Sequence, residues 1–479
     1  MKRAFFLCAI VLLAAGNGFC GEKKKWDLQS LIEHSLSSRD DLTAQKEKIR
    51  QAEYKIKEAF SHYFPRLHFS AAYTKAESKV KLDLSDYKLD TVVKTRVRGQ
   101  VTVTDLPGNP SYGFNVPVSA PISVSLPKDI TLIDDEYGGV SVILDQPLFT
   151  WGRITNYVKA AKNSKKFENA KNREAQIDVI YQVRTAYYSF LVAREARDFA
   201  DKVFQEIQTV RRLLQKQLGK NEGEDILKVT KLDLMEIEGF HLHTKGLRAK
   251  TSSAERSALA YLSLAAGLTK TLQARDIKGA IDIGIRLPLE VDCIAIGLKS
   301  NPLLEAVNSG IEAHNYLAKA ERAAMLPVLG VRGFYKKLNT NGILKPDDYY
   351  GVSIVLKGPI FDSGEIWAKA NQHLSKVREL SNRKTFLKSY LETSISTLYN
   401  EIKSLQTNLK IDRQEMELID KRLRLALFGL MNKIVSYRDY KDAFVMRSIV
   451  KREYFERLLT FHEKVNLLIK MTGSANMLI

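Results

Sequence analysis

Hydrophobic and polar positions alternate one by one in several short segments of the chain. Apolar side chains alternate with His, Ser and Ala over residues 67–73, and the same period of two recurs at 139–145 and 352–357. Such alternation predicts strands with one apolar and one more polar face. We therefore expect four strands, at about 65–76, 137–150, 327–338 and 349–361.

A different pattern, with a longer period, covers most of the remaining chain. Neither glycine nor proline occurs between Gly152 and Gly219 or between Gly364 and Gly429. At ~1.5 Å per residue, an uninterrupted helix over either stretch would be on the order of 100 Å long. Apolar residues in the second stretch step by four and three, at Leu391, Ile395, Leu398, Ile402, Leu405 and Leu409. This period of 3.5 residues predicts coiled-coil packing.

Each long helix is expected to turn back on itself. Glycines at 219 and 429 interrupt the pattern at matching places, and helical periodicity resumes toward Gly267 and Gly473. The sequence therefore predicts two long antiparallel helical hairpins, at about 153–267 with its tip at 219 and at about 365–473 with its tip at 429.

The two halves of the chain repeat each other. Residues 137–149 match 349–361 at an offset of 212, whereas residues 38–44 match 300–306 at an offset of 262. We interpret this as a tandem duplication, with a first repeat at 21–284 and a second at 285–479.

The difference between the two offsets places about fifty extra residues in the first copy, at about 76–136. Residues 95–104 alternate like strands around Gly99, and several prolines follow. This insertion fits either a tolerated surface loop on the extracellular side or an external cap that contacts a partner.

The N-terminus has the pattern of a secretory signal peptide. Basic Lys2 and Arg3 precede an apolar run from Ala4 to Ala15, which is shorter than the ~20 residues that cross a bilayer. We predict a signal peptide at 1–20. The bulky residue before Cys20 disfavours lipidation of that cysteine. Cleavage would leave one cysteine, so no internal disulfide could form.

Charge and hydropathy restrict the function further. The formal net charge is +19, but Lys and Arg are mixed with Asp and Glu along the helical stretches, which is typical of solvated faces rather than of a nucleic-acid surface. No later segment is apolar enough for a transmembrane helix, which excludes an inner-membrane transporter, so any membrane insertion must use strands. Four strands are too few to close a barrel, which needs about eight. The chain must therefore oligomerise.

The sequence offers no constellation for catalysis, cofactor binding or metal binding. His241 and His243 lie two residues apart and so point to different sides of a helix. Neither a Walker-type phosphate loop nor a Gly-x-Ser-x-Gly motif occurs. We expect no enzyme and no cofactor.

The mature chain resembles the outer-membrane efflux (TolC-like) family. The resemblance rests on paired openings at 31–36 and 295–302, on paired Pro-containing segments, and on the tip glycines. The Pro-containing segments are 64–67 with 326–329 and 146–149 with 358–361. The resemblance implies a mainly α fold with a membrane β-barrel, in which each protomer gives two long coiled-coil hairpins and four strands to a trimeric duct.

The same resemblance implies a function and a location. Such a homotrimer spans the outer membrane of a Gram-negative bacterium and extends into the periplasm. There it would conduct substrates passively from an inner-membrane transporter, through a periplasmic adaptor, in tripartite efflux or type I secretion. Two alternatives are a periplasmic coiled-coil adaptor, which needs one hairpin flanked by compact β-domains, and an enzyme on a helical scaffold.

The resemblance also points to the hairpin tips as the site of gating and adaptor docking. Similar proteins often carry acidic residues six and nine positions after the tip glycine, which form a cation-selective constriction. Asp225 takes the sixth position in the first copy, but the second copy has Val435 and Arg438 there, with Asp439 one place further on. The mouth is therefore expected to be less cation-selective or even basic, unless these charges pair locally at the surface.

Overall fold

The computed structural model describes residues 25–83, 97–101, 112–116, 129–133, 135–218, 229–340 and 348–474. The predicted signal peptide at 1–20, including Cys20, lies outside them. The chain divides into two compact units. One contains residues 1–57, 157–318 and 370–479, and the other contains residues 58–156 and 319–369. Helices make up most of the first unit, and strands make up most of the second.

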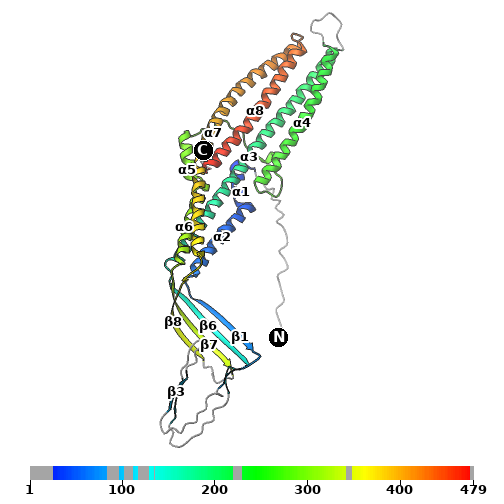
Figure 1. Ribbon diagram of the computed structural model, residues 1–479. Coiled ribbons are helices and arrows are strands. Elements are labelled where there is room, and N and C mark those ends of the chain that lie inside the picture. Colours follow the sequence, from blue (N-terminus) through cyan, green and yellow to red (C-terminus); the bar gives the residue numbers. More distant parts are fainter. Residues whose placement is uncertain are drawn as a thin grey trace, which may run out of the picture. The chain divides into compact units, whose positions relative to one another are not determined.

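The strand unit contains a four-stranded antiparallel sheet with the order β1-β6-β7-β8 (Figure 1). Its strands are β1 Arg66–Lys75, β6 Glu136–Phe149, β7 Val328–Thr340 and β8 Tyr349–Lys357. The last strand ends four residues before the expected 361. Proline cannot donate to a strand ladder, so Pro359 disfavours pairing beyond β8, whereas Pro147 lies at an irregularity in the register between β6 and β7.

The register of the sheet separates its two faces. Leu67 lies opposite Leu144, and Phe69 lies opposite Val142, so apolar positions of neighbouring strands share one face. On the other face Arg332 donates to Asp145 at 2.6 Å. The exposed large apolar side chains of the first face include Leu67, Phe69, Tyr73, Val140, Leu144, Tyr335, Tyr350, Val352, Ile354 and Leu356.

The insertion of the first copy contains two further antiparallel pairs of strands. β2 Val80–Asp83 pairs with β5 Asp129–Ile133, and β3 Val97–Val101 pairs with β4 Tyr112–Val116. The strand-like alternation noted around Gly99 coincides with β3. The other residues between 84 and 128 lie outside the described part of the chain.

Four shorter helices open the two repeats. They are α1 Leu28–Ser38, α2 Asp40–Ser61, α5 Glu290–Ser300 and α6 Pro302–Ala323. Both ends of α5 lie 262 residues after those of α1, and α6 follows α2 at the same distance. The element bounds therefore repeat at the offset found in the sequence. Asp27 caps α1, because its side chain accepts a hydrogen bond from the Ser30 backbone at 2.8 Å.

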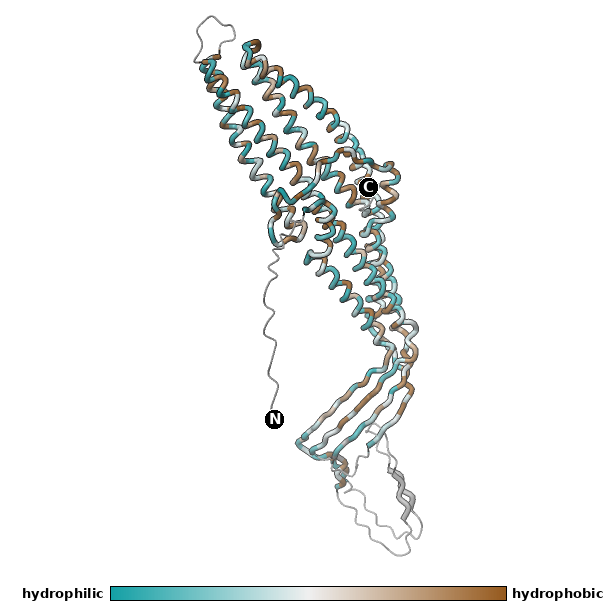
Figure 2. The backbone as a smooth tube through the Cα atoms, turned by 180° about the vertical axis from the view of Figure 1, so that it is seen from behind, coloured by the Kyte–Doolittle hydropathy of each residue, from teal (hydrophilic) through white to brown (hydrophobic). Residues whose placement is uncertain are grey.

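Four long helices lie side by side in the helical unit, in the order α7, α8, α3, α4 (Figures 1 and 2). They are α3 Arg153–Leu218, α4 Lys231–Ala265, α7 Glu365–Met431 and α8 Tyr437–Thr472. Hydrophobic and hydrophilic residues alternate along each of them (Figure 2). Among the described residues, no helix has both the length and the apolarity needed to cross a membrane.

The apolar seam predicted on the second long helix is confirmed. Of its six residues, Leu391, Ile395, Leu398, Ile402 and Leu409 are buried, and Leu405 packs against the same core. This core joins α7 to α8, where Phe461 is fully buried. A second core lies among α1, α3 and α4, and a third joins all four long helices toward the hairpin tips.

One buried histidine lies between the two hairpins. His462 of α8 is 1% exposed, and its ring stacks on Tyr188 of α3 with centroids 3.9 Å apart. Neither ring nitrogen has a hydrogen-bond partner among the described residues. Burial, reinforced by nearby Arg184, lowers the pKa of His462 to about 4. The imidazole is therefore neutral in the folded protein at physiological pH.

We expect His462→Phe to reduce the pH dependence of stability. The folded pKa lies below the usual ~6.5, so the unfolded chain takes up the proton more readily. The contribution of the neutral His462 to the free energy of unfolding is complete above pH ~6.5 and is lost progressively as the pH falls toward 4. Denaturant unfolding of the wild type and the variant from pH 4 to 7.5 measures the effect. Equal slopes of the free energy of unfolding against pH in the two proteins would contradict it.

Candidate functional site

The turn of the second hairpin lies slightly later than the sequence indicated. α7 continues to Met431, and α8 begins at Tyr437, so Gly429 lies inside the last turn of α7 rather than at the break. The Gly429 carbonyl accepts hydrogen bonds from the backbone N–H groups of Ile434 at 2.7 Å and Val435 at 3.3 Å. These bonds satisfy a carbonyl that the helix end would otherwise leave unpaired.

The turn requires a glycine at position 429 because the returning chain packs directly on it. A Cβ atom there would lie 2.7 Å from the Val435 side chain. Gly429 is buried, and Lys433 takes the left-handed conformation with φ of 57°. The glycine therefore marks the tip by permitting a close approach rather than by ending the helix.

Asp439 caps a helix. The Asp439 carboxylate accepts hydrogen bonds from the Ser436 hydroxyl at 2.6 Å and the Ser436 backbone at 3.0 Å. In return, Ser436 accepts from the Asp439 backbone at 3.3 Å. The Ser436 hydroxyl, with the backbone bond, lowers the pKa of Asp439. Thr230 and Asp233 form the same capping box at the start of α4.

Of the other tip residues predicted from the sequence, the structure describes Arg438 but neither Gly219 nor Asp225. Arg438 is exposed at the second position of α8. Its neighbours Tyr437 and Tyr440 are buried, and burial raises the pKa of both phenols. Gly219 and Asp225 lie outside the described residues. A gating role for these positions stays a prediction.

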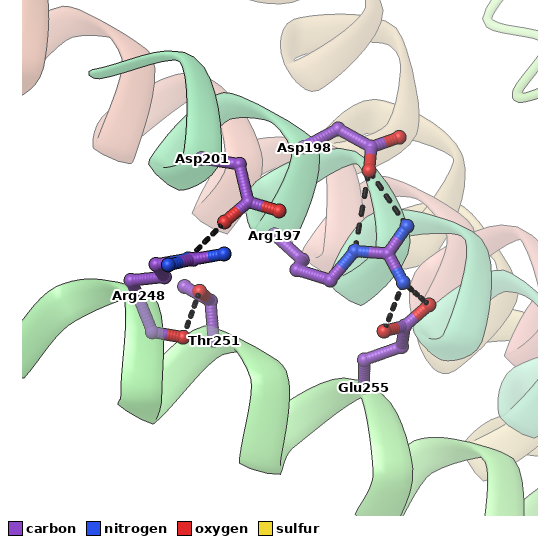
Figure 3. Close-up of polar contacts among 6 residues, drawn as sticks. All are labelled: Arg197, Asp198, Asp201, Arg248, Thr251 and Glu255. Atoms are coloured by element: carbon purple, nitrogen blue, oxygen red, sulfur yellow. Dashed lines mark hydrogen bonds and ion pairs between the residues drawn. The ribbon is translucent and has the colours of Figure 1, made fainter. Parts of the chain in front are cut away.

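Charged contacts hold the first hairpin together (Figure 3). Arg197 of α3 donates from one nitrogen to both carboxylate oxygens of Glu255 in α4, at 2.7 and 2.5 Å. The guanidinium also binds Asp198, at 2.7 and 3.2 Å. One to two turns away, Arg248 of α4 donates to Asp201 of α3 at 2.6 Å. Glu255 is buried, so the bidentate contact neutralises a desolvated charge.

A second set of charged contacts connects α8 to α3 of the other hairpin and to α7 of its own. Arg447 of α8 binds Glu206 of α3 and lies 3.9 Å from Asp420 of α7. Arg457 of α8 binds Asp412 of α7, which is 3% exposed. Burial raises the pKa of Asp412, although Arg457 opposes the shift. The sequence did not indicate these pairs, because a charge on a long helix gives no sign of which neighbouring helix it will meet.

An open cleft of about 550 Å³ lies beside Arg447, between α3, α7 and α8. Charged side chains of both signs line it, among them Glu195, Asp198, Lys202, Glu206, Asp420 and Arg424. Within the described part of the chain, no group of three or more His, Cys, Asp or Glu residues could hold a metal ion. The cleft is therefore lined largely by charged side chains.

Comparisons with known proteins identify a similar family and similar solved structures. Residues 31–219 match the family model described as outer membrane efflux protein. This part of the chain is therefore similar to the outer membrane efflux protein family. A search of curated proteins finds no match. The matched residues fall in the first repeat, and the element bounds of the second repeat follow those of the first.

Solved structures share the fold along nearly the whole chain. The outer membrane protein VceC from Vibrio cholerae is 14% identical, with a TM-score of 0.68, over 93% of this chain and 96% of its own. The MtrE outer membrane channel of Neisseria gonorrhoeae is 15% identical, with a TM-score of 0.64, over 93% and 89%. A membrane protein from Pseudomonas aeruginosa is 15% identical, with a TM-score of 0.70, over 93% of both chains.

The family match covers residues 31–219, and the solved outer-membrane channels share the fold over the rest of the chain. The predicted fold class is also confirmed, since long helices accompany a four-stranded antiparallel sheet.

We expect Ser436→Ala to destabilise the second tip by about 1 kcal/mol, the usual cost of losing an N-terminal cap. The lowered pKa of Asp439 means that the capping contribution is complete above the unfolded pKa and is lost as the pH falls through the folded value. Hydrogen exchange at the start of α8 measures the loss. Asp442→Ala, at an exposed position one turn further on, serves as the control.

If Asp442→Ala accelerates hydrogen exchange as much as Ser436→Ala does, the capping box does not stabilise this turn.

Proposed function

We propose that three copies of this protein form a passive channel through the outer membrane. Each copy would contribute its four-stranded sheet to one barrel and its two hairpins to one periplasmic tunnel. A periplasmic adaptor would join the hairpin tips to an inner-membrane transporter, which supplies the energy. Tripartite efflux and type I secretion are the two systems that this assembly fits. The similarity of residues 31–219 to the outer membrane efflux protein family supports the trimer.

The observation that carries this proposal is the uncovered apolar face of the sheet. Val352 is 79% exposed and Ile354 is 77% exposed, although both are aliphatic strand residues. They share their face with the apolar residues of β1 and β6, since the strands pair in register. A contiguous apolar patch of this kind marks a membrane or a protein partner. Lipid covers such a face in a membrane barrel.

The edges of the sheet support closure by other copies. β1 and β8 are its outer strands, and within the described residues no further strand pairs with their free edges. In lipid, each unpaired backbone group would cost several kcal/mol, so a sheet must close on itself. Pairing of β8 in one copy with β1 in the next satisfies both edges around a ring.

The tips are the proposed docking and gating region. Gly429 lies at the turn of the second hairpin. We assign Gly219, Asp225 and Arg438 to the channel mouth, where the opposite charges of Asp225 and Arg438 set ion selectivity. Asp439 contributes mainly by capping α8. The charged cleft beside Arg447 offers the adaptor a polar contact surface.

The mass of the detergent-solubilised protein tests the assembly. Native mass spectrometry should find three copies of the chain in one complex. A single copy, stable in detergent and inactive after reconstitution, would contradict the proposal.

Substitutions on the two faces of β8 test the barrel assignment. We expect Ile354→Lys to cost about 2–4 kcal/mol if the side chain faces the middle of the bilayer, and to reduce the amount of folded protein in the outer membrane. Ser353→Lys, on the polar face, is the matched control and should insert normally. Heat-modifiable migration of membrane fractions on gels measures folded protein. Equal insertion of both variants would argue against a lipid-facing apolar face.

A further inference from the structure

Two exposed stripes run along the outer long helices. In α4 the stripe steps by three and four and consists of Leu232, Met235, Gly239, Leu242, Gly246 and Ala249. In α7 the stripe has the same steps and consists of Ile411, Gln414, Leu418, Lys421, Leu425 and Phe428. All twelve residues are exposed, and Met235 and Leu425 are 72% and 71% exposed. Such spacing is that of a coiled-coil seam that lacks its partner.

The two stripes lie at opposite edges of the helical layer. Figures 1 and 2 show α8 and α3 between α7 and α4 from both sides. The two helices run in opposite directions, because both tips lie at the same end, where Gln217 binds the Leu430 carbonyl and Lys441 binds Glu236. A pair of different surfaces on one protomer generates a head-to-tail ring if the rotation closes.

We propose that α4 of one copy packs antiparallel against α7 of the next copy, with Leu242 opposite Leu418. This proposal rests on the trimer proposed above and specifies how its helices join. The register then places every apolar residue of α4 against an apolar residue of α7. The apolar pairs are Leu232 with Phe428, Met235 with Leu425, Leu242 with Leu418, and Ala249 with Ile411.

The same register explains two glycines inside α4. Gly239 comes opposite Lys421, and Gly246 comes opposite Gln414. Glycine in a helix interior costs roughly 1 kcal/mol relative to alanine. Within the described protomer a Cβ at either position would meet no atom within 4 Å, so packing inside one copy does not require glycine. Across the seam, the missing side chains leave room for the two long polar side chains to cross α4 and reach solvent.

Charges beside the seam select this register. Residues that flank an antiparallel seam on the same side face each other. Lys245 then faces Glu417, and Glu238 faces Arg424. On the other side Glu236 faces Arg422, and His243 faces Glu415. Glu238 and Glu236 also bind Arg211 and Lys441 within the protomer, and a carboxylate can accept from two partners.

A shift of one heptad in either direction loses this complementarity. One shift brings Lys245 opposite Arg424, and the other brings Lys245 opposite Lys410 and Glu238 opposite Glu417. Like charges facing each other are destabilising. The occupant that matches both stripes in spacing, size and charge is therefore a second copy of this chain.

Disulfide cross-linking of the full-length protein in outer membranes tests the pairing. Leu242→Cys combined with Leu418→Cys should convert the monomer band into covalent dimers and trimers on non-reducing gels. The pair Leu242→Cys and Leu425→Cys is displaced by one heptad, about 10 Å along the helix, and should remain monomeric. Cys293 is buried and is present in every variant. Cross-linking of the displaced pair alone, or of neither pair, would overturn the proposed register.

A size swap tests the role of the glycines independently. Gly239→Leu should reduce the trimer fraction, because the new side chain competes with Lys421 for the same space, and Lys421→Gly should restore it in the double variant. Leucine favours helix over glycine, so loss of the trimer cannot be ascribed to a weakened α4. Unchanged trimer in Gly239→Leu would contradict the seam.

The wild-type mass separates the two proposals. A wild-type complex of three copies without the predicted cross-links refutes the seam alone and leaves these stripes to the adaptor. A wild-type protein that is not trimeric refutes the proposed function itself.

Discussion

The free edges of the four-stranded sheet are the constraint from which the assembly follows. β1 and β8 each leave one row of backbone groups unpaired within the described residues. Water can satisfy such groups, but the apolar side chains on one face of the same sheet disfavour exposure to water. Lipid suits these side chains and cannot satisfy the edges. In the proposed channel, pairing with strands of other copies meets both requirements.

The long helices also carry apolar side chains that must be covered. Each long helix buries one seam inside the protomer, as the core around Ile395 and Phe461 shows, while α4 and α7 also carry a second, exposed seam. Between neighbouring helices, the buried carboxylates of Glu255 and Asp412 pair with the partly exposed Arg197 and Arg457. Removing one partner of a buried pair leaves a desolvated charge and costs about 3–5 kcal/mol. Such pairs therefore penalise sliding of one helix past another.

Regular periodicity was the part of the structure that the sequence revealed well. The seam of α7 and the strands β1, β6 and β7 could be predicted because gathering apolar side chains on one face imposes a fixed period on many successive residues. The helices α1, α2, α5 and α6 were not identified, although the repeat that contains them was noticed. They are short or largely polar, and helix α2 buries only Leu42 and Ala52, so their apolar pattern is weak.

The tips show the limits of counting residues along a sequence. A fixed offset from the tip glycine paired Asp225 with the region of Val435 and Asp439. The structure instead gives Asp439 and Asp233 the same capping role at the starts of α8 and α4. The two turns also differ in length.

 Twelve residues separate α3 from α4, whereas five separate α7 from α8. Equal counts from the two glycines therefore reach positions at different distances along the chain from the start of the next helix.

Single-channel recording of the purified protein in planar lipid bilayers tests the central claim most directly. The account predicts discrete, uniform conductance steps, because a closed ring of three copies encloses one water-filled path. Protein that binds the bilayer without any conductance, or that gives only irregular current without defined steps, would contradict the channel.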